Sequence, residues 1–404
     1  MLKKHGRHIL SALLAASSLL QISASHAASG FQQCINSIQQ QAEQKGIPSD
    51  IINEALGTVA PITRTIELDR KQPEFNETFA NYLNKRVTNF RIQQGRKLLQ
   101  ENKALLDKLT KEYGVPAHYL VSFWGLETNY GSYLGKFPVI DTLATLACDH
   151  RRSNYFTKEV IAAMELMDEF DIPREQMLGS WAGAMGHTQF MPSAYLNYGI
   201  DGENNDTVNL WSSVPDAMSS AANFLNGLGW HKSWKWGREV LLPEDYNYLN
   251  AGLKNKKTLS EWRKLGVTTT FGGLLPDDQA EASLLIPAGY RGPAFLVYDN
   301  FHVIMGWNRS ISYALAVGIL ADRINGSPDL HRSPPVDSPR LNVEQIKALQ
   351  IKLTQLGFDS GTPDGVIGSG TRKAIREYQH SQQMIADGYP GKKVFESLNI
   401  ALNK

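Results

Sequence analysis

The sequence predicts a mainly helical protein with a small β element and a separate, helical C-terminal domain. Apolar residues recur at helical spacing through most of the chain, whereas clear strand alternation is rare before residue 240. The clearest strand candidate is the run Ala-Phe-Leu-Val-Tyr at residues 294–298. A Pro-rich stretch at residues 327–341 then sets apart about sixty C-terminal residues, which is enough for one small domain.

The first 27 residues have the composition of a secretory signal. Basic side chains precede an apolar stretch at residues 9–20, and Ser25 and Ala27 place small side chains at the −3 and −1 positions of a cleavage site. The apolar stretch is too short for a membrane span, and no later stretch has the required length. No Cys follows Ala27 directly, so a bacterial lipid anchor is not indicated. We therefore expect export and cleavage after Ala27.

Charge and cysteine content exclude two classes of site. Residues 1–27 hold three of the 41 basic side chains, which leaves 38 against 40 acidic ones, a formal charge of −2 for the mature chain. Such a chain is not an electrostatic nucleic-acid binder, and its partner should be neutral or mildly charged. Cys34 and Cys148 are too few for a metal cluster. In an oxidising compartment we expect them to form a disulfide.

Helical segments are expected in succession from residue 31 to about residue 109. Ile35, Ile38 and Ala42 share one helix face, and Gly, Pro and Ser interrupt the pattern at residues 46–50. Pro116 suits the first turn of the next helix. Further helices are expected at residues 142–147, 160–167 and 299–323, and three more in the C-terminal domain at 343–356, around 374–378 and at 394–402.

Glu127 is the strongest candidate for a catalytic residue. It lies in an apolar, helix-like run, and Leu120, Trp124 and Glu127 fall on one helix face. No basic residue stands between Tyr119 and Tyr133 to pair with it locally. Burial without a cationic partner favours the neutral acid, as a proton donor requires. The alternative is a buried glutamate held by structural hydrogen bonds.

Two other stretches supply polar groups that could converge on Glu127. Residues 180–193 combine small residues with a hydroxyl, Ser180, and an amide, Gln189. Residues 306–313 offer an indole, an amide and a phenol, from Trp307, Asn308 and Tyr313 respectively. Tight packing is the alternative for the small residues, and for Gln189 both interpretations stay open.

A polar loop near residue 201 is a candidate calcium site. Oxygen-bearing side chains stand at positions 1, 3, 5 and 7 of a loop that begins at Asp201, as in the start of an EF-hand. Asp206 replaces the Gly expected at position 6, and Ser212 replaces the Glu expected at position 12. Asp216 could supply the missing carboxylate. A polar turn without metal is the alternative.

Several separated motifs make residues 31–325 resemble the lytic murein transglycosylase B family of bacterial cell-wall enzymes. The motifs are residues 124–131 (Trp-Gly-Leu-Glu-Thr-Asn-Tyr-Gly), 143–147, 183–186, 189–193, 209–211 and 308–310. The last domain is similar to the three-helix peptidoglycan-binding module, through residues 349, 356–358, 363–368, 371, 374–375 and 378–379.

The resemblance implies a lysozyme-like α+β catalytic domain that cuts the β-1,4 bond between N-acetylmuramic acid and N-acetylglucosamine and leaves a 1,6-anhydromuramyl end. Glu127 would act first as the acid and then as the base, so that no second carboxylate is needed. The sugar-binding residues would be Ser180, Gln189, Asn308, Tyr313, Tyr130, Trp307 and Phe224. The chain departs from the family in two places, because members often have Tyr at the position of Trp307 and an aromatic hydroxyl at that of Phe224.

The same resemblance suggests the domain organisation and the setting. We expect a signal peptide at residues 1–27, a catalytic domain at 28–326, a linker at 327–341 and a peptidoglycan-binding domain at 342–404. The enzyme would act on glycan strands in the periplasm of a Gram-negative bacterium, with no required cofactor. In family members that bind Ca²⁺ the ligands correspond to Asp201, Glu203, Asn205 and Asp216.

Two alternatives to this function remain. A hydrolytic muramidase would need a second carboxylate, such as Asp141 or Asp201, and would leave a reducing end. A non-catalytic scaffold would only bind glycan, and Glu127→Gln would then change no turnover.

Overall fold

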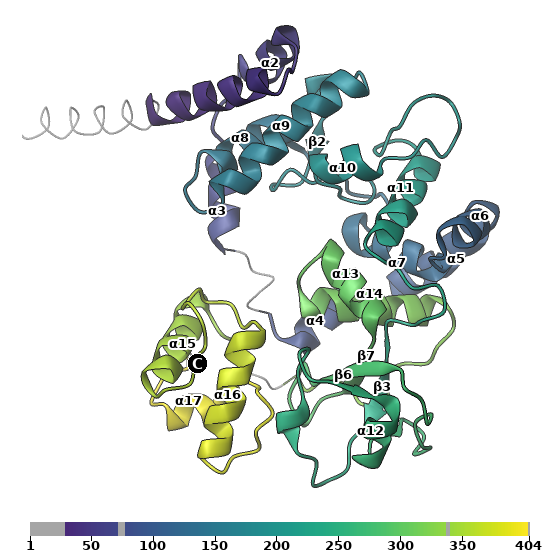
Figure 1. Ribbon diagram of the computed structural model, residues 1–404, viewed down its shortest axis with the longest axis vertical. Coiled ribbons are helices and arrows are strands. Elements are labelled where there is room, and N and C mark those ends of the chain that lie inside the picture. The colour runs from purple at the N-terminus through teal and green to yellow at the C-terminus, as the bar shows by residue number, and fades with distance from the viewer. Residues whose placement is uncertain (1–28, 72–76, 337–339, 403–404) are drawn as a thin grey trace, which may run out of the picture. The chain divides into compact units, whose positions relative to one another are not determined.

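The computed structural model describes residues 29–71, 77–336 and 340–402. The predicted signal peptide, residues 1–27, lies outside the described residues. The chain divides into two units, of which unit 1 holds residues 1–71 and 134–217 and unit 2 holds residues 72–133 and 218–404. The described chain is mainly helical, as predicted, with small antiparallel sheets (Figure 1). The domain boundaries at residues 326 and 342 stay a prediction.

Unit 1 consists of helices and one two-stranded sheet. Its elements are a first helix described from residue 29 to 44, α2 (Ser49–Leu56), α3 (Thr63–Lys71), β1 (Phe137–Pro138), α8 (Val139–Ala147), α9 (Ser153–Glu169), η2 (Arg174–Gln176), β2 (Leu178–Gly179) and α10 (Pro192–Tyr198). The predicted face of the first helix is buried, because Ile35, Ile38 and Ala42 are at most 1% exposed. α11 (Val214–Gly227) begins in unit 1 and ends in unit 2.

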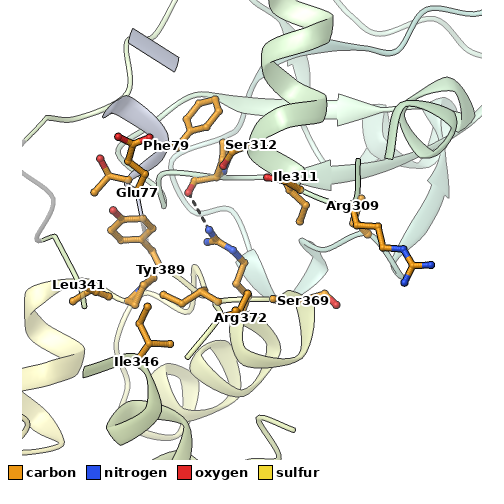
Figure 2. A pocket seen from close by; sticks show the side chains of 18 of the residues that line it. Glu77, Phe79, Arg309, Ile311, Ser312, Leu341, Ile346, Ser369, Arg372 and Tyr389 are labelled. Atoms are coloured by element: carbon orange, nitrogen blue, oxygen red, sulfur yellow. Dashed lines mark hydrogen bonds between the residues drawn. The ribbon is translucent and has the colours of Figure 1, made fainter. Parts of the chain in front are cut away.

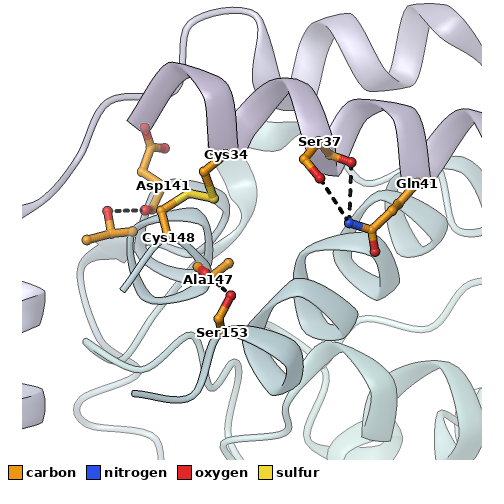
Figure 3. The surroundings of a disulfide bond; sticks show 8 residues. Cys34, Ser37, Gln41, Asp141, Ala147, Cys148 and Ser153 are labelled. Atoms are coloured by element: carbon orange, nitrogen blue, oxygen red, sulfur yellow. Dashed lines mark hydrogen bonds between the residues drawn. A yellow bond between two sulfur atoms is a disulfide. The ribbon is translucent and has the colours of Figure 1, made fainter. Parts of the chain in front are cut away.

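A disulfide joins the first helix to the end of α8. Cys34 projects from the helix and meets Cys148, the residue that follows α8, with the two Cα atoms 5.8 Å apart (Figure 3). The bond closes a loop of 114 residues in sequence separation. It therefore restricts the unfolded chain over a long segment.

The helices of unit 2 surround α7 and α14. The first group is α4 (Phe79–Arg86), α5 (Asn89–Glu101), α6 (Lys103–Tyr113) and α7 (Ala117–Thr128), and the second is α13 (Asp299–Trp307) and α14 (Ile311–Ile324). α7 and α14 are buried around almost their whole circumference and pack against each other. The Ser122 hydroxyl on α7 donates to the Val317 carbonyl on α14 at 2.7 Å. This pair forms the rigid centre of the unit.

The β element of unit 2 is a five-stranded antiparallel sheet with the order β4-β6-β7-β3-β5. Its elements are β3 (Gly237–Leu241), η3 (Tyr248–Asn250), β4 (Lys256–Thr258), α12 (Leu259–Lys264), β5 (Thr268–Thr269), β6 (Glu281–Leu285) and β7 (Ala294–Val297). The strand predicted at residues 294–298 is the fully buried β7. Trp262 of α12 covers this sheet and is completely buried.

The continuous helix predicted at residues 299–323 is wrong, because residues 308–310 break it. The Asn308 side chain accepts a hydrogen bond from the Ser310 N–H at 3.0 Å, and the Ser310 hydroxyl caps α14 by accepting from the Tyr313 N–H at 3.3 Å. These local bonds compete with continued helix. In the described part of the chain no single helix is long and apolar enough to cross a membrane. α13 and α14 reach that length and composition only as a pair, which is bent by 114°.

Three helices near the C-terminus share a core of their own. They are α15 (Val343–Gln355), α16 (Ser369–Ser381) and α17 (Lys392–Ser397). Fully buried Ile346, Leu349, Ile375 and Phe395 meet at its centre. The third helix ends at residue 397, earlier than the predicted residue 402.

We predict that replacing both cysteines, as Cys34→Ser with Cys148→Ser, lowers the free energy of unfolding by about 2–5 kcal/mol. The physical reason is the chain entropy that the unfolded state regains when a long loop is no longer closed. Urea denaturation followed by circular dichroism, without reductant, measures the difference.

Wild-type protein kept in reductant is the matched control and should unfold at the same urea concentration as the double variant. A variant that unfolds with the oxidised wild type would contradict a stabilising role for the bond.

Candidate active site

Glu127 lies in the last turn of α7, and its side chain is half-buried. Leu120 and Trp124, which share its helix face, are almost completely buried. The carboxyl group therefore stands at the border between the core and the surface, where it is less deeply buried than the sequence pattern indicated. At such a position a carboxyl group is partly shielded from water and can still contact a ligand.

The chain turns sharply directly after Glu127. Asn129, Tyr130 and Gly131 all have positive φ angles, of 51°, 63° and 78°. Two consecutive non-Gly residues in this region are unusual and mark a backbone that the surroundings hold in place. The Thr128 hydroxyl contributes by accepting from the Gly131 N–H at 3.0 Å. The turn fixes the end of α7 and with it the position of Glu127.

The Tyr130 side chain connects this turn to α5 and α7. Its phenol donates to the Arg91 carbonyl at 2.6 Å, and burial raises its pKa. Its ring passes so close to Gly125 that a Cβ there would lie 2.7 Å from Cζ. Because the hydroxyl is engaged with the backbone, a substrate contact by Tyr130 would involve its ring.

Tyr313 is the direct partner of Glu127 on the neighbouring helix. Ser310 caps α14 one turn before Tyr313, and the Tyr313 side chain is only 5% exposed. Its hydroxyl donates a short hydrogen bond to Oε1 of Glu127. The structure thus joins two candidates that lie 186 residues apart in sequence. A hydrogen bond to one oxygen fixes the orientation of the carboxyl group.

Aromatic rings line the same region. The Trp307 ring lies 4.5 Å from that of Phe123 and 5.1 Å from that of Phe224, measured between centroids. Phe123 also lies 6.3 Å from the Tyr313 ring. Trp307 and Phe224 are partly exposed, as expected of rings that could face a ligand. Phe123 was missed from the sequence, although it precedes Glu127 by four residues and so shares its helix face.

Ser180 and Gln189 belong to unit 1, and each is held within its own loop. The Ser180 oxygen accepts from the N–H groups of Ala182 and Ala184 at 3.3 and 3.1 Å. The Gln189 amide nitrogen donates to the carbonyls of Leu134 and Gly186 at 3.2 and 3.0 Å. These bonds leave the Ser180 O–H as a donor and the Gln189 Oε1 as an acceptor for a ligand. Their convergence with Glu127 stays a prediction.

The candidate calcium ligands do not form a closed set. Asp201 accepts from the N–H groups of Glu203 and Asp206, at 3.1 and 2.8 Å. The completely buried Asp216 accepts from the N–H groups of Gly202 and Asn209, at 2.9 and 2.7 Å. Among the described residues, no three His, Cys, Asp or Glu side chains are grouped so that they could hold a metal ion. As arranged, these carboxylates order the loop through its backbone.

The carboxylates considered for a hydrolytic mechanism have structural partners within unit 1. Asp141 forms an ion pair with Arg174 at 2.8 Å and accepts from the Ala60 N–H at 3.2 Å. Although desolvation raises the pKa of Asp201, backbone hydrogen bonds outweigh it and lower this pKa. Both groups therefore have roles that do not require a substrate.

Comparisons with known proteins match two parts of the chain. A family model for the transglycosylase SLT domain matches residues 30–322, and a model for a peptidoglycan binding domain matches residues 342–398. The chain is 32% identical over 253 residues to membrane-bound lytic murein transglycosylase B of Escherichia coli strain K12, covering 62% of this chain and 68% of that protein.

Solved structures show the same similarity. SltB3 from Pseudomonas aeruginosa, in complex with a NAG-anhNAM-pentapeptide, has a TM-score of 0.87 at 40% identity, covering 91% of this chain and 99% of that chain. The Escherichia coli lytic transglycosylase Slt35, in complex with calcium, has a TM-score of 0.64 at 28% identity, covering 73% of this chain and 92% of that chain.

Proposed function

The chain belongs to the transglycosylase SLT domain family, and on this basis we propose that it cleaves the β-1,4 bond between N-acetylmuramic acid and N-acetylglucosamine without adding water. The observation that supports this most directly is the half-buried Glu127, oriented by the Tyr313 hydroxyl beside partly exposed aromatic rings. A sugar can stack on such rings while its glycosidic oxygen meets the acid.

Glu127 serves first as the general acid. Its proton passes to the glycosidic oxygen, the bond from that oxygen to C1 of the muramyl sugar breaks, and N-acetylglucosamine leaves as an alcohol. The carboxylate that remains then takes the proton of the muramyl C6 hydroxyl, and the C6 oxygen bonds to C1. The product is the 1,6-anhydro sugar, and Glu127 ends protonated as it began.

Tyr313 positions this carboxyl group. Because its hydroxyl donates to Oε1 of Glu127, the acidic proton of the neutral form is carried by Oε2. The donor also stabilises the carboxylate in the middle of the cycle, since hydrogen bonds to charged groups are the stronger ones. The buried and capped start of α14 keeps Tyr313 in place through both half-reactions.

The polar residues that the family resemblance singles out would bind the sugars. Ser180 and Gln189 offer one donor and one acceptor, and Asn308 offers its amide N–H groups, since its oxygen accepts from Ser310. Trp307 and Phe224 replace aromatic hydroxyls that family members often have, so they would contribute stacking surface. Tyr130 would support the site through its ring.

The three C-terminal helices would hold the enzyme on its polymeric substrate. Their match to a peptidoglycan binding domain supports this assignment. A tethered second site raises the local concentration of glycan at the active site. We also propose that residues 1–27 direct the chain to the periplasm of a Gram-negative bacterium, which N-terminal sequencing of the exported protein would check.

We predict that Glu127→Gln lowers the release of anhydro products by about 10²–10⁴-fold, because the amide can neither give nor take the proton. Gln keeps an acceptor for Tyr313, so the fold should be retained. Mass spectrometry of muropeptides released from purified peptidoglycan measures the effect, with Glu101→Gln on exposed helix α5 as control.

The masses also separate the alternatives. Products with water added would make this chain a hydrolase with a second carboxylate, and release of no product by the wild type would leave a glycan-binding scaffold.

Tyr313→Phe should lower the rate of cleavage by about 10–100-fold with a small change in KM. Loss of a hydrogen bond to a charged group is worth about 1.5–3 kcal/mol. The ring stays, so its tilted contact with the Phe123 ring is preserved. Steady-state kinetics on a soluble glycan checks this.

Tyr195→Phe is the matched control, since it removes a buried hydroxyl that donates to the Val208 carbonyl in unit 1. Equal kinetic losses in the two variants would contradict a positioning role for Tyr313.

Calcium has no part in the reaction written above. An ion bound at Asp201, Glu203, Asn205 and Asp216 would stabilise the loop by mass action. It would then raise the melting temperature of the wild type by several degrees in millimolar Ca²⁺, and Asp201→Asn would abolish the rise. An unchanged melting temperature would refute calcium binding at this loop.

A further inference from the structure

A cavity of about 310 Å³ lies where the C-terminal helices meet the rest of unit 2. The C-terminal side contributes residues 366–369, Arg372 and Tyr389, and the opposite side includes residues 77–79 and 309–312 (Figure 2). Two further hollows, of about 30 and 380 Å³, continue along α16, between it and residues 249–255. We call this row of hollows the α16 seam. It is distinct from the region of Glu127, which lines none of the three hollows.

Arg372 projects from α16 into the seam (Figure 2). Among the described residues it makes one hydrogen bond, to the Pro287 carbonyl, and this bond is 3.5 Å long, which is the limit for such a bond. None of the ion pairs among the described residues includes Arg372. Burial lowers its pKa from the usual value. Arg372 is only partly exposed, so with one weak bond its guanidinium can still offer most of its five N–H donors to a ligand.

Arg376 stands one turn further along the same face of α16. It lines both further hollows, and burial lowers its pKa to about 10, so it remains charged at neutral pH. The described residues offer it no hydrogen bond and no ion pair. Lys373, between the two arginines in sequence, also lines one hollow, but it is exposed and pairs with Glu377 at 3.5 Å. Among these three basic side chains, only the two arginines lack an ion pair with a described residue.

The acidic groups near the seam accept hydrogen bonds or form ion pairs with other residues, although Asp387 also attracts both arginines electrostatically and Glu377 attracts Arg376. Asp387 accepts from the N–H groups of Tyr290 and Tyr389 and from the Gln379 side chain, at 2.9–3.0 Å. Glu77 pairs with Lys85. Arg309 also lines the cavity, but its guanidinium points away from the Arg372 side chain (Figure 2).

Helix geometry reinforces the positive character of the cavity. α14 and α16 both begin at it, with Ile311 and Ser369 in its lining. The N-terminus of a helix carries a partial positive charge. The ligand that suits two unpaired, partly desolvated guanidinium groups is an oxyanion, and a planar carboxylate matches their fork geometry.

We propose that the α16 seam binds carboxylate groups of the peptide stems that peptidoglycan carries, through Arg372 and Arg376. This inference rests on the proposed function, since the anionic groups of that substrate are the carboxylates of its peptides. The chain would therefore prefer glycan strands that carry peptides over peptide-free strands. The seam would bind the peptide, while Glu127 acts on the sugar.

The test measures binding by the full chain in a Glu127→Gln background, so that the ligand is not consumed. The probes are a tetrasaccharide of peptidoglycan with pentapeptide stems and the same tetrasaccharide without peptide. Calorimetry should show tighter binding of the peptide-bearing probe, and Arg372→Gln and Arg376→Gln should each reduce that preference about tenfold. Lys392→Gln, on α17 and outside the lining of all three hollows, should leave it unchanged.

Two results would overturn the proposal: a preference that survives the double variant, or an equal loss of affinity for both probes, which a structural role of the arginines would produce. A third probe, with amidated peptide carboxylates, tests the unmutated arginines and should bind like the peptide-free one. If it binds as tightly as the acidic probe, the proposal fails.

Wild-type cleavage of the peptide-free probe is assayed in parallel. Absence of cleavage there would contradict the proposed function, whereas cleavage without any peptide preference would contradict this inference alone.

Discussion

The contact between α7 and α14 is the constraint on which the catalytic region of unit 2 depends. α7 carries the acid, α14 carries the phenol that orients it, and the Ser122 hydroxyl ties the two backbones together. Both helices are buried on nearly every side, so neither can rotate without opening the core. The short distance between two side chains 186 residues apart is therefore a property of the whole unit rather than of either helix.

Much of the helical architecture was predictable, because burial imposes a period that the sequence shows directly. The face of Ile35, Ile38 and Ala42, the strand at residues 294–298 and the three C-terminal helices were found in this way. The family resemblance is confirmed by the match over residues 30–322. The break at residues 308–310 was missed, since apolar periodicity continues across it while Asn308 and Ser310 bond locally to the backbone.

The site was less predictable than the fold. Glu127 could be singled out because a carboxylate in an apolar run is unusual, but its partner could not be derived from spacing. Tyr313 was named through the resemblance, and only the packing of two distant helices shows which oxygen it binds. The sequence did not single out Arg372 and Arg376 of α16 as binding residues, because two basic residues on a helix normally face water. Whether Ser180 and Gln189 join Glu127 remains a prediction.

The Cys34–Cys148 bond has a consequence for the proposed export of the chain. Export through a narrow channel requires a polypeptide that is still unfolded, and a very stable precursor would resist passage. In the export proposed above, the newly made chain would lack the bond in the reducing compartment, fold less firmly and stay competent for transport. The bond would then form in the oxidising compartment and stabilise the fold. The disulfide would thus be absent from the chain during export and present in the folded enzyme.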